Sequence, residues 1–506
     1  MTSQEDVRTS VDAGEVTEAT TLLDAGRSSA TRFADRHRRR VIFVTFIVLF
    51  CLELGAGLVM PGITVALEQK ICDHINAGLE AVDKDCKAPA VQGQLAVLRG
   101  WQTTVDCIPG LVATVPYGIL ADKWGRHRAI ILACTGTTMS LAFQLFVAYF
   151  QSIPVQVILF SPVFYFLGGG PAVISAMAFT SVADVTPVSA RAPIYLQLSA
   201  LSIISDLVAN ALAGLILLKS LWGLNLLGLS LFALSVFFAC FLPETLRPVR
   251  SGGSPHGIDD DTDMDATQAS PELSPVKESL RKFHNSMKDV VSFLNGHRYE
   301  IILMICFVFS VLSRLVQDML LQYTTKRFNW SWSKAAFLLT IRSAVSLVAL
   351  IIVLPALSQF LLTKSKVSPI RKDVWIARIT GLAGILGSLL IALSSTPGLL
   401  IPGLVIFALS GGMLGVLRSL LSSMVEPRHM GTLNSLIAVL EMVGLMIAGP
   451  SLFWSLRLGI EWGGGWSGLP FFCAAAMLSV STAVVSFLPI REKQRPYSPS
   501  HEEEVI

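Results

Sequence analysis

Acidic and basic side chains lie inside long apolar stretches of this chain of 506 residues, where a charge needs a physical reason. A charged side chain at the centre of a bilayer costs about 2.5–3.5 kcal/mol on insertion scales, so such residues commonly mark the path of a substrate or an ion. Carboxylates can carry protons or bind cations, and guanidinium groups can bind anions. The candidates for a proton or substrate site are Glu53, Asp106, Asp206, Glu441 and Arg418.

Glu53 lies in the middle of an apolar stretch that Gly55, Gly57 and Pro61 interrupt. An apolar cavity favours the neutral form of a carboxylate, so Glu53 could carry a proton near neutral pH or hold a substrate cation. A structural hydrogen bond to another helix is the alternative. Glu441 occupies a similar place in the second half of the chain and is the counterpart candidate.

Asp106 and Asp206 are also at the middle of their stretches, where they could pair with each other, with Arg99 or with a cationic substrate. Arg418 could attract an anionic substrate or neutralise a carboxylate. The eight histidines lie in expected tails and loops, so we expect any proton coupling to run through carboxylates.

Arg314 and Asp318 are four residues apart, which places them on one face of a helix, and Arg342 lies at a comparable depth in the next stretch. An internal ion pair is the simpler interpretation of this group. The same cluster could also close a gate at the outward end of the molecule.

The composition indicates a protein with many membrane spans. Hydrophobic residues make up 52% of the chain and charged residues 15%, whereas soluble domains average about 25% charged residues. The mean hydropathy is +0.61. This balance excludes a conventional soluble enzyme, and the net charge of +3 gives no reason to expect a nucleic-acid partner. Phosphate-binding loops, metal-ligand patterns and nucleophile motifs are absent from the sequence, so we expect neither an enzyme nor a cofactor.

Apolar stretches of about 20 residues are long enough to cross a bilayer, and they must be helical because lipid cannot satisfy open backbone groups. The sequence contains twelve, at 41–67, 93–121, 129–150, 154–182, 193–218, 222–242, 299–321, 335–360, 374–394, 398–425, 431–455 and 466–489. The expected fold is therefore an all-α membrane protein with twelve transmembrane helices in two six-helix bundles. The expected domains begin with a disordered cytosolic tail at 1–40 and a six-helix bundle at 41–242. A cytosolic linker with a disordered part and a possible amphipathic helix follows at 243–298. The second six-helix bundle is expected at 299–489 and a second cytosolic tail at 490–506.

Lys and Arg concentrate in the first tail and in alternate loops, which places both termini in the cytosol. With this orientation, the sequon at Asn329 faces outward, where it could be glycosylated or remain unused. Cys72 and Cys86 share an outward loop, where they could form a disulfide or remain free.

The two halves contain a repeated pattern. Gly169-Gly170 is followed by Asp184, and Gly411-Gly412 is followed by Glu426, with an offset of 242 residues at each position. This pattern favours two parallel structural repeats, although glycine pairs are common in membrane helices.

The loop between the second and third stretches reads GILADKWGRHR over residues 118–128. It resembles the loop signature of the major facilitator superfamily, with His127 departing at one basic position. The corresponding second-half loop, 361–373, keeps the basic residues but lacks the glycine and the aspartate. The resemblance implies breakable ion pairs near the inner membrane surface that involve Asp122, Arg126, Arg128, Asp184 and Arg191.

The nearest resemblance is to fungal transporters of this superfamily, many of them associated with secondary metabolites. It implies a monomeric secondary transporter that moves a small organic molecule by alternating access, with proton-coupled efflux as the leading hypothesis. Proton-coupled uptake of a nutrient and a non-transporting membrane sensor or scaffold are the alternatives. We expect the plasma membrane, with the vacuolar membrane as the alternative because residues 18–23 resemble an acidic dileucine signal.

Overall fold

The computed structural model describes residues 5–77, 84–245, 298–363, 368–424 and 430–487, and within these ranges the chain forms helices and no strand. Eleven of the described helical segments are long and apolar enough to cross a membrane. The second span, which carries Arg99 and Asp106, is a helix of 36 residues packed among them. The expected all-helical membrane fold is therefore confirmed.

Six spans form the first half. Their elements are α1 (Glu5–Ile75), α2 (Pro89–Trp124), α3 (Arg126–Tyr149), η1 (Val155–Leu167) followed by α4 (Gly170–Val185), α5 (Val188–Leu217) and α6 (Leu221–Ala239). One of these helices, α6, begins at a side-chain cap. Ser220 accepts a hydrogen bond from the backbone nitrogen of Gly223 at 3.0 Å at the start of α6.

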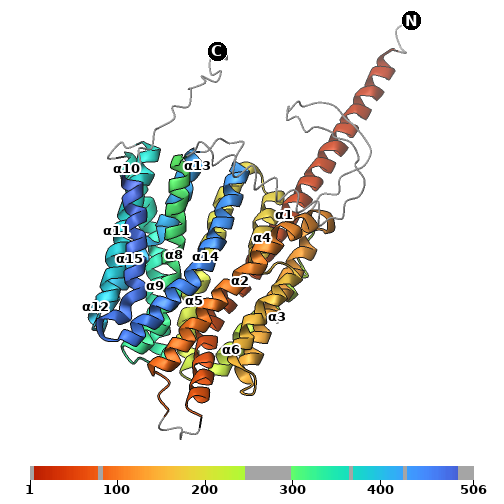
Figure 1. The fold of residues 1–506 in the computed structure, drawn as a ribbon. Coiled ribbons are helices and arrows are strands. Elements are labelled where there is room, and N and C mark those ends of the chain that lie inside the picture. Colours follow the sequence, from red (N-terminus) through yellow and green to blue (C-terminus); the bar gives the residue numbers. More distant parts are fainter. Residues whose placement is uncertain (1–4, 78–83, 246–297, 364–367, 425–429, 488–506) are drawn as a thin grey trace, which may run out of the picture.

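The second half repeats this plan. Its elements are α8 (Arg298–Arg327), α9 (Trp332–Val348) with η2 (Ala349–Val353) and α10 (Leu354–Thr363), α11 (Pro369–Leu393), α12 (Pro397–Ala408) with η3 (Leu409–Gly412) and α13 (Met413–Met424), α14 (Met430–Trp462), η5 (Gly464–Gly468) and α15 (Leu469–Phe487). In Figure 1 the end of α1 and the start of α2 lie at the lower end of the molecule, which is the outward end under the predicted orientation.

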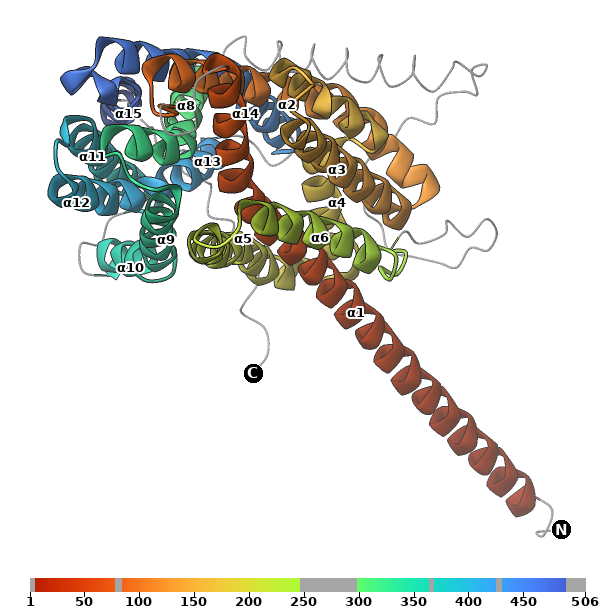
Figure 2. The same cartoon turned by 90° about the horizontal axis from the view of Figure 1, so that it is seen from below.

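Two pairs of helices join the halves: α2 packs against α14, and α5 packs against α9 (Figure 2). Gly100 and Gly449 permit the first contact, because a Cβ at Gly449 would lie 2.6 Å from the carbonyl oxygen of Gly100. Small residues let helix backbones approach closely in a membrane. Thr104 adds a hydrogen bond of 3.0 Å to the carbonyl oxygen of Met446.

The fourth span differs from the continuous helix expected over 154–182. It consists of the 3₁₀ segment η1 and the α-helix α4, separated by Gly168 and Gly169. The φ angles of Gly168, Gly169 and Gly170, the first residue of α4, are 146°, 85° and 65°. Positive φ is accessible to glycine at little steric cost. Gly168 also contacts α3 closely, because a Cβ there would lie 2.4 Å from the backbone nitrogen of Ala133. The glycines that suggested a repeat therefore mark a break in the helix.

The amino-terminal segment also differs from the expected disordered tail, because α1 extends back to Glu5 as one helix with the first span (Figure 1). Most of the linker expected at 243–298, with its amphipathic helix, lies outside the described residues, as do 490–506.

Candidate functional site

A central cavity of about 400 Å³ lies between the two halves. Its charged lining comes from both of them: Glu53 on α1, Asp206 on α5, Asp318 on α8, Arg342 on α9 and Glu441 on α14. Three of the sequence-predicted proton or substrate candidates are thus brought together. Four carboxylates facing one guanidinium give the central cavity an acidic character.

Asp206 and Arg342 form an ion pair across the cavity, with 2.7 Å between Oδ2 of Asp206 and Nη2 of Arg342. Ser343 donates a hydrogen bond of 3.0 Å to the same carboxylate oxygen, and Gln317 accepts one from Arg342. Because α5 and α9 belong to different halves, this pair links the halves at the central cavity. The sequence suggested that Asp206 could pair with Asp106 or Arg99, but its partner is Arg342.

Glu441 approaches Arg418 of α13, with 3.7 Å between Oε2 and Nη2. The two side chains are 37% and 52% exposed, although both lie in spanning segments. Glu441 lines the central cavity, and Arg418 reaches it from α13. This ion pair is compatible with one of the two roles that the sequence allowed for Arg418, neutralisation of a carboxylate, and the role stays a prediction.

Asp106 lies in another cavity, of about 430 Å³, formed mostly by the first half, with Met442 and Leu445 of α14 completing its wall. We call it the N-chamber; its polar lining includes Arg99, Gln102, Asp106, Gln144 and Tyr165. Arg99 is buried and donates a hydrogen bond of 2.9 Å to Gln102, which in turn donates one of 3.2 Å to Gln144. Oδ1 of Asp106 is buried and has no hydrogen-bond partner within the described part of the chain.

The inner ends of the first half are held by a polar cluster. Arg126 forms an ion pair of 2.9 Å with Asp184, and Thr245 donates a hydrogen bond of 3.2 Å to that aspartate. Glu244 accepts a hydrogen bond of 3.0 Å from the backbone nitrogen of Arg126. Arg126 and Asp184 thus meet as the motif implied, but within one half. Arg128 is exposed.

The side chains of three predicted gating residues, Asp122, Arg191 and Arg314, lie outside the described part of the structure. Their roles stay predictions. Asp318, which was expected to pair with Arg314, lines the central cavity.

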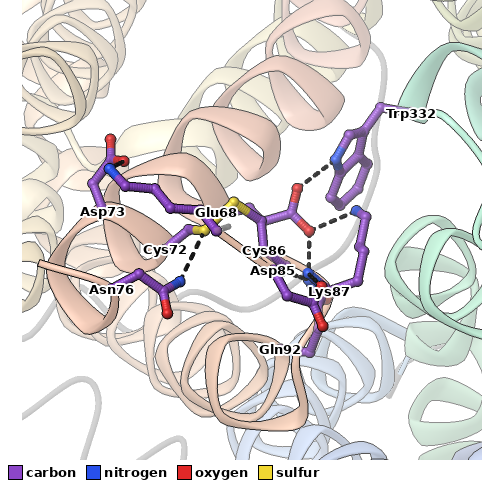
Figure 3. Close-up of a disulfide and its surroundings, with 10 residues drawn as sticks. Glu68, Cys72, Asp73, Asn76, Asp85, Cys86, Lys87, Gln92 and Trp332 are labelled. Carbon is purple, nitrogen blue, oxygen red and sulfur yellow. Dashed lines mark hydrogen bonds and ion pairs between the residues drawn. A yellow bond between two sulfur atoms is a disulfide. The ribbon is translucent and has the colours of Figure 1, made fainter. Parts of the chain in front are cut away.

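A second link between the halves lies at their outward ends (Figure 3). The carboxylate of Glu68 forms an ion pair of 2.6 Å with Lys87 and accepts a hydrogen bond of 2.6 Å from the indole nitrogen of Trp332 on α9. Gln92 donates to the same carboxylate. Nζ of Lys87 lies 4.4 Å from the centroid of the Trp332 ring. We call these four residues the outer latch.

The side chain of Lys87 is largely buried in the outer latch. Burial lowers the pKa of Lys87, and the adjacent carboxylate of Glu68 opposes that shift. Further contacts reach α8 of the second half, because Gln322 donates a hydrogen bond of 2.8 Å to the carbonyl oxygen of Gln92. The outer latch is therefore a charged contact between the halves that excludes much of the solvent.

Cys72 and Cys86 form a disulfide beside the outer latch. Glu68 precedes Cys72 by one helical turn, and Lys87 follows Cys86 directly, so the disulfide holds the two charged residues near each other (Figure 3). Sequence reasoning singled out the cysteines but missed the latch residues. The feature that could have identified them is the position of Glu68, which directly follows the first apolar stretch at its outward end.

Asn329 is exposed in the turn between α8 and α9, next to the outward end. Its φ of 52° lies in the left-handed region that asparagine tolerates in turns. The position is accessible to a glycan. Within the described residues, no group of three or more His, Cys, Asp or Glu side chains could hold a metal ion.

Two six-span halves around a shared charged cavity define a membrane transporter. The family model described as Major Facilitator Superfamily matches residues 93–449. The MFS efflux pump atnC of Emericella nidulans is 32% identical, with 82% of this chain and 79% of the relative covered. The efflux pump ustT of Aspergillus flavus is 31% identical, with 79% and 78% covered. This chain belongs to the Major Facilitator Superfamily.

Solved structures agree in fold. A D-xylose-proton symporter matches with a TM-score of 0.59 at 13% identity, covering 88% of this chain and 97% of that one. The human organic anion transporter MFSD10 matches with a TM-score of 0.55 at 17% identity, covering 88% and 99%. These likenesses support the twelve-span architecture.

Proposed function

We propose that this protein exports a small organic molecule from the cytosol by alternating access and that protons moving inward drive the export. The observation that carries the proposal is the central cavity, where Glu53, Asp206, Asp318 and Glu441 converge from both halves. Carboxylates in a cavity that changes its access can take up a proton on one side of the membrane and release it on the other. The names of the relatives atnC and ustT as efflux pumps favour export.

The two links between the halves fit the alternating-access part of the proposal. The outer latch joins the halves at the outward end, and the ion pair between Asp206 and Arg342 joins them at the central cavity. Opening to the outside requires that the hydrogen bond between Glu68 and Trp332 and the ion pair between Asp206 and Arg342 break or rearrange. A proton or a substrate cation that binds Asp206 would weaken the second link, which couples binding to the movement of the halves.

Export is tested by comparing small molecules in cells and medium of the native host, with and without this gene. We expect a compound that accumulates in deletion cells and disappears from their medium. A compound that wild-type cells deplete from the medium, and deletion cells leave behind, would show uptake instead. Identical profiles would favour a sensor or scaffold. We place the protein, as a monomer, in the plasma membrane; the same cells can show by fractionation whether it lies in the vacuolar membrane.

A further inference from the structure

The structure contains a second cavity that corresponds to the N-chamber through the internal repeat. This cavity, of about 320 Å³, is formed mostly by the second half, with Ile203 and Asp206 of α5 completing its wall. Its polar lining includes Ser310, Ser313, Gln317, Ser346 and Ser410. We call it the C-chamber. Like the N-chamber, it lies where the fourth span of its own half departs from an α-helix, at η3.

The correspondence holds residue by residue along the broken spans. Tyr165, Pro171 and Ala172 line the N-chamber, and the positions 242 residues later line the C-chamber. Those positions are Phe407, Met413 and Leu414. The offset is the one that relates the glycine pairs of the two halves. Irregular backbone at membrane depth is tolerated where it is buried in protein or lines a cavity, and broken spans commonly form transporter binding sites.

Each chamber has an arginine at a similar place in a helix, with an offset of 243 residues between the two. Arg99 lies ten residues into α2 and Arg342 ten residues into α9, and each lines the chamber of its own half. The chemistry of the remaining walls differs. The N-chamber is mostly apolar, with a polar stripe from Arg99 to Gln144, whereas the C-chamber is rich in serine hydroxyl groups.

Both chambers adjoin the central cavity. Leu445 lines the N-chamber and the central cavity, while Asp206, Gln317 and Arg342 line the C-chamber and the central cavity. The central cavity therefore shares part of its wall with each chamber. A ligand that occupied all of them would be extended, because its ends would lie in different halves.

We propose that the two chambers form one binding site for an extended amphipathic molecule, with an apolar body in the N-chamber and a hydroxyl- or amide-rich end in the C-chamber. The serine hydroxyls retain acceptor capacity beyond the hydrogen bonds that they donate, so they suit ligand O–H and N–H groups. In the N-chamber, the unpartnered Oδ1 of Asp106 offers an acceptor for one donor on the apolar body. The proposal rests on the transport function and specifies its substrate class.

The test uses purified full-length protein in lipid nanodiscs and two fluorescent probes. One probe is a dansyl group joined by a short alkyl linker to glucamine, and the other is dansylamide, which lacks the polyol. Ala56→Phe fills the N-chamber, because Ala56 is an exposed lining residue. Gly415→Leu fills the C-chamber, because a Cβ at Gly415 meets no atom within 4 Å. Gly398→Leu is the matched control outside both chambers, where a Cβ meets only Oγ1 of Thr396 at 3.9 Å.

We expect Ala56→Phe to weaken both probes at least tenfold and Gly415→Leu to weaken only the dansyl–glucamine probe by that factor. Gly398→Leu should bind both probes as the wild type does. Should a filling variant lose its folded elution profile, Thr103→Leu or Ser346→Leu replaces it in the same chamber. Failure of the wild type to bind dansyl–glucamine, or equal effects of Gly415→Leu on both probes, would overturn the proposal. Binding needs no gradient, so the result is independent of the direction of transport.

Discussion

Asp206 connects the chemistry of the cavity to the contact between the halves, because its partner Arg342 lies on the opposite half at 2.7 Å. The carboxylate is 42% exposed, so water or a proton can reach it, while the arginine is 15% exposed. Protonation of Asp206 would remove the charge that holds Arg342 in place. A neutral Asp206 is therefore expected to favour separation of α5 from α9.

We predict that Asp206→Asn lowers proton-driven export at least tenfold while the exchange of substrate across the membrane without a gradient persists. The amide keeps the shape of the side chain and one acceptor oxygen but cannot take up or release a proton. The measurement is the transport of the exported compound with and without an imposed pH gradient. Glu461→Gln is the control, because Glu461 forms an exposed ion pair with Arg457 within α14. If Asp206→Asn and the wild type transport the compound at equal rates under a pH gradient, Asp206 is not part of the proton-coupling site.

The charged residues of the central cavity could be predicted individually from the sequence, but their partners could not. The cost of a charge in lipid is local, so Glu53, Asp206 and Glu441 stand out within apolar stretches. The partner of Asp206 depends on the packing of α5 against α9, which no local pattern specifies. Glu68 escaped notice because it lies at the edge of its stretch, where a charge costs little.

At the scale of the elements, the break in the fourth span depends on glycine. Gly168 has a φ of 146° and touches the backbone of Ala133, so an added methyl group would meet both torsional strain and overlap. We predict that Gly168→Ala lowers the free energy of unfolding of the purified protein by at least about 1–2 kcal/mol, and its melting temperature with it. The measurement is thermal unfolding of both proteins in the same detergent.

Gly398→Ala serves as the control for this substitution, since a Cβ there would meet only Oγ1 of Thr396, at 3.9 Å. If Gly168→Ala melts at the same temperature as the wild type and the control, the break in the fourth span does not depend on glycine at position 168. The sequence predicted a span here and noted its glycines. It did not predict the 3₁₀ conformation of η1, because hydropathy is insensitive to the type of helix.

The outer latch connects the elements α1, α2 and α9 through few side chains, so the loss of one contact should be measurable. Trp332→Phe removes the indole donor to Glu68 and keeps an aromatic ring under Lys87. A hydrogen bond to a charged group contributes about 1.5–3 kcal/mol, and each 1.4 kcal/mol is a factor of ten in population. We predict that the outward-open population rises about tenfold or more.

The measurement is the rate at which an impermeant maleimide, added from outside, labels a cysteine introduced by Ser202→Cys in the central cavity, after the free cysteines have been replaced. Trp454→Phe is the control, because that tryptophan is exposed beside Arg457 and lies outside the outer latch. Unchanged labelling in Trp332→Phe, relative to Trp454→Phe, would mean that the outer latch does not hold the outward end closed.

At the scale of the whole molecule, two repeated halves carry chambers of different chemistry that share one acidic cavity. The repeat, the number of spans and the superfamily could be predicted from the sequence because they depend on hydropathy, charge bias and one loop motif. The cavities could not, since their walls come from spans far apart in the chain. The arrangement makes the central cavity the place where proton binding and substrate binding can influence each other.

Inside-out membrane vesicles that contain this protein provide the most direct test of proton-driven export, with the compound identified in the medium as the substrate. The lumen of such vesicles corresponds to the outside of the cell. We predict that an acidic lumen drives accumulation of the compound and that a protonophore abolishes it. Accumulation that does not change with the pH gradient, or that requires an alkaline lumen, would contradict proton-driven export through this cavity.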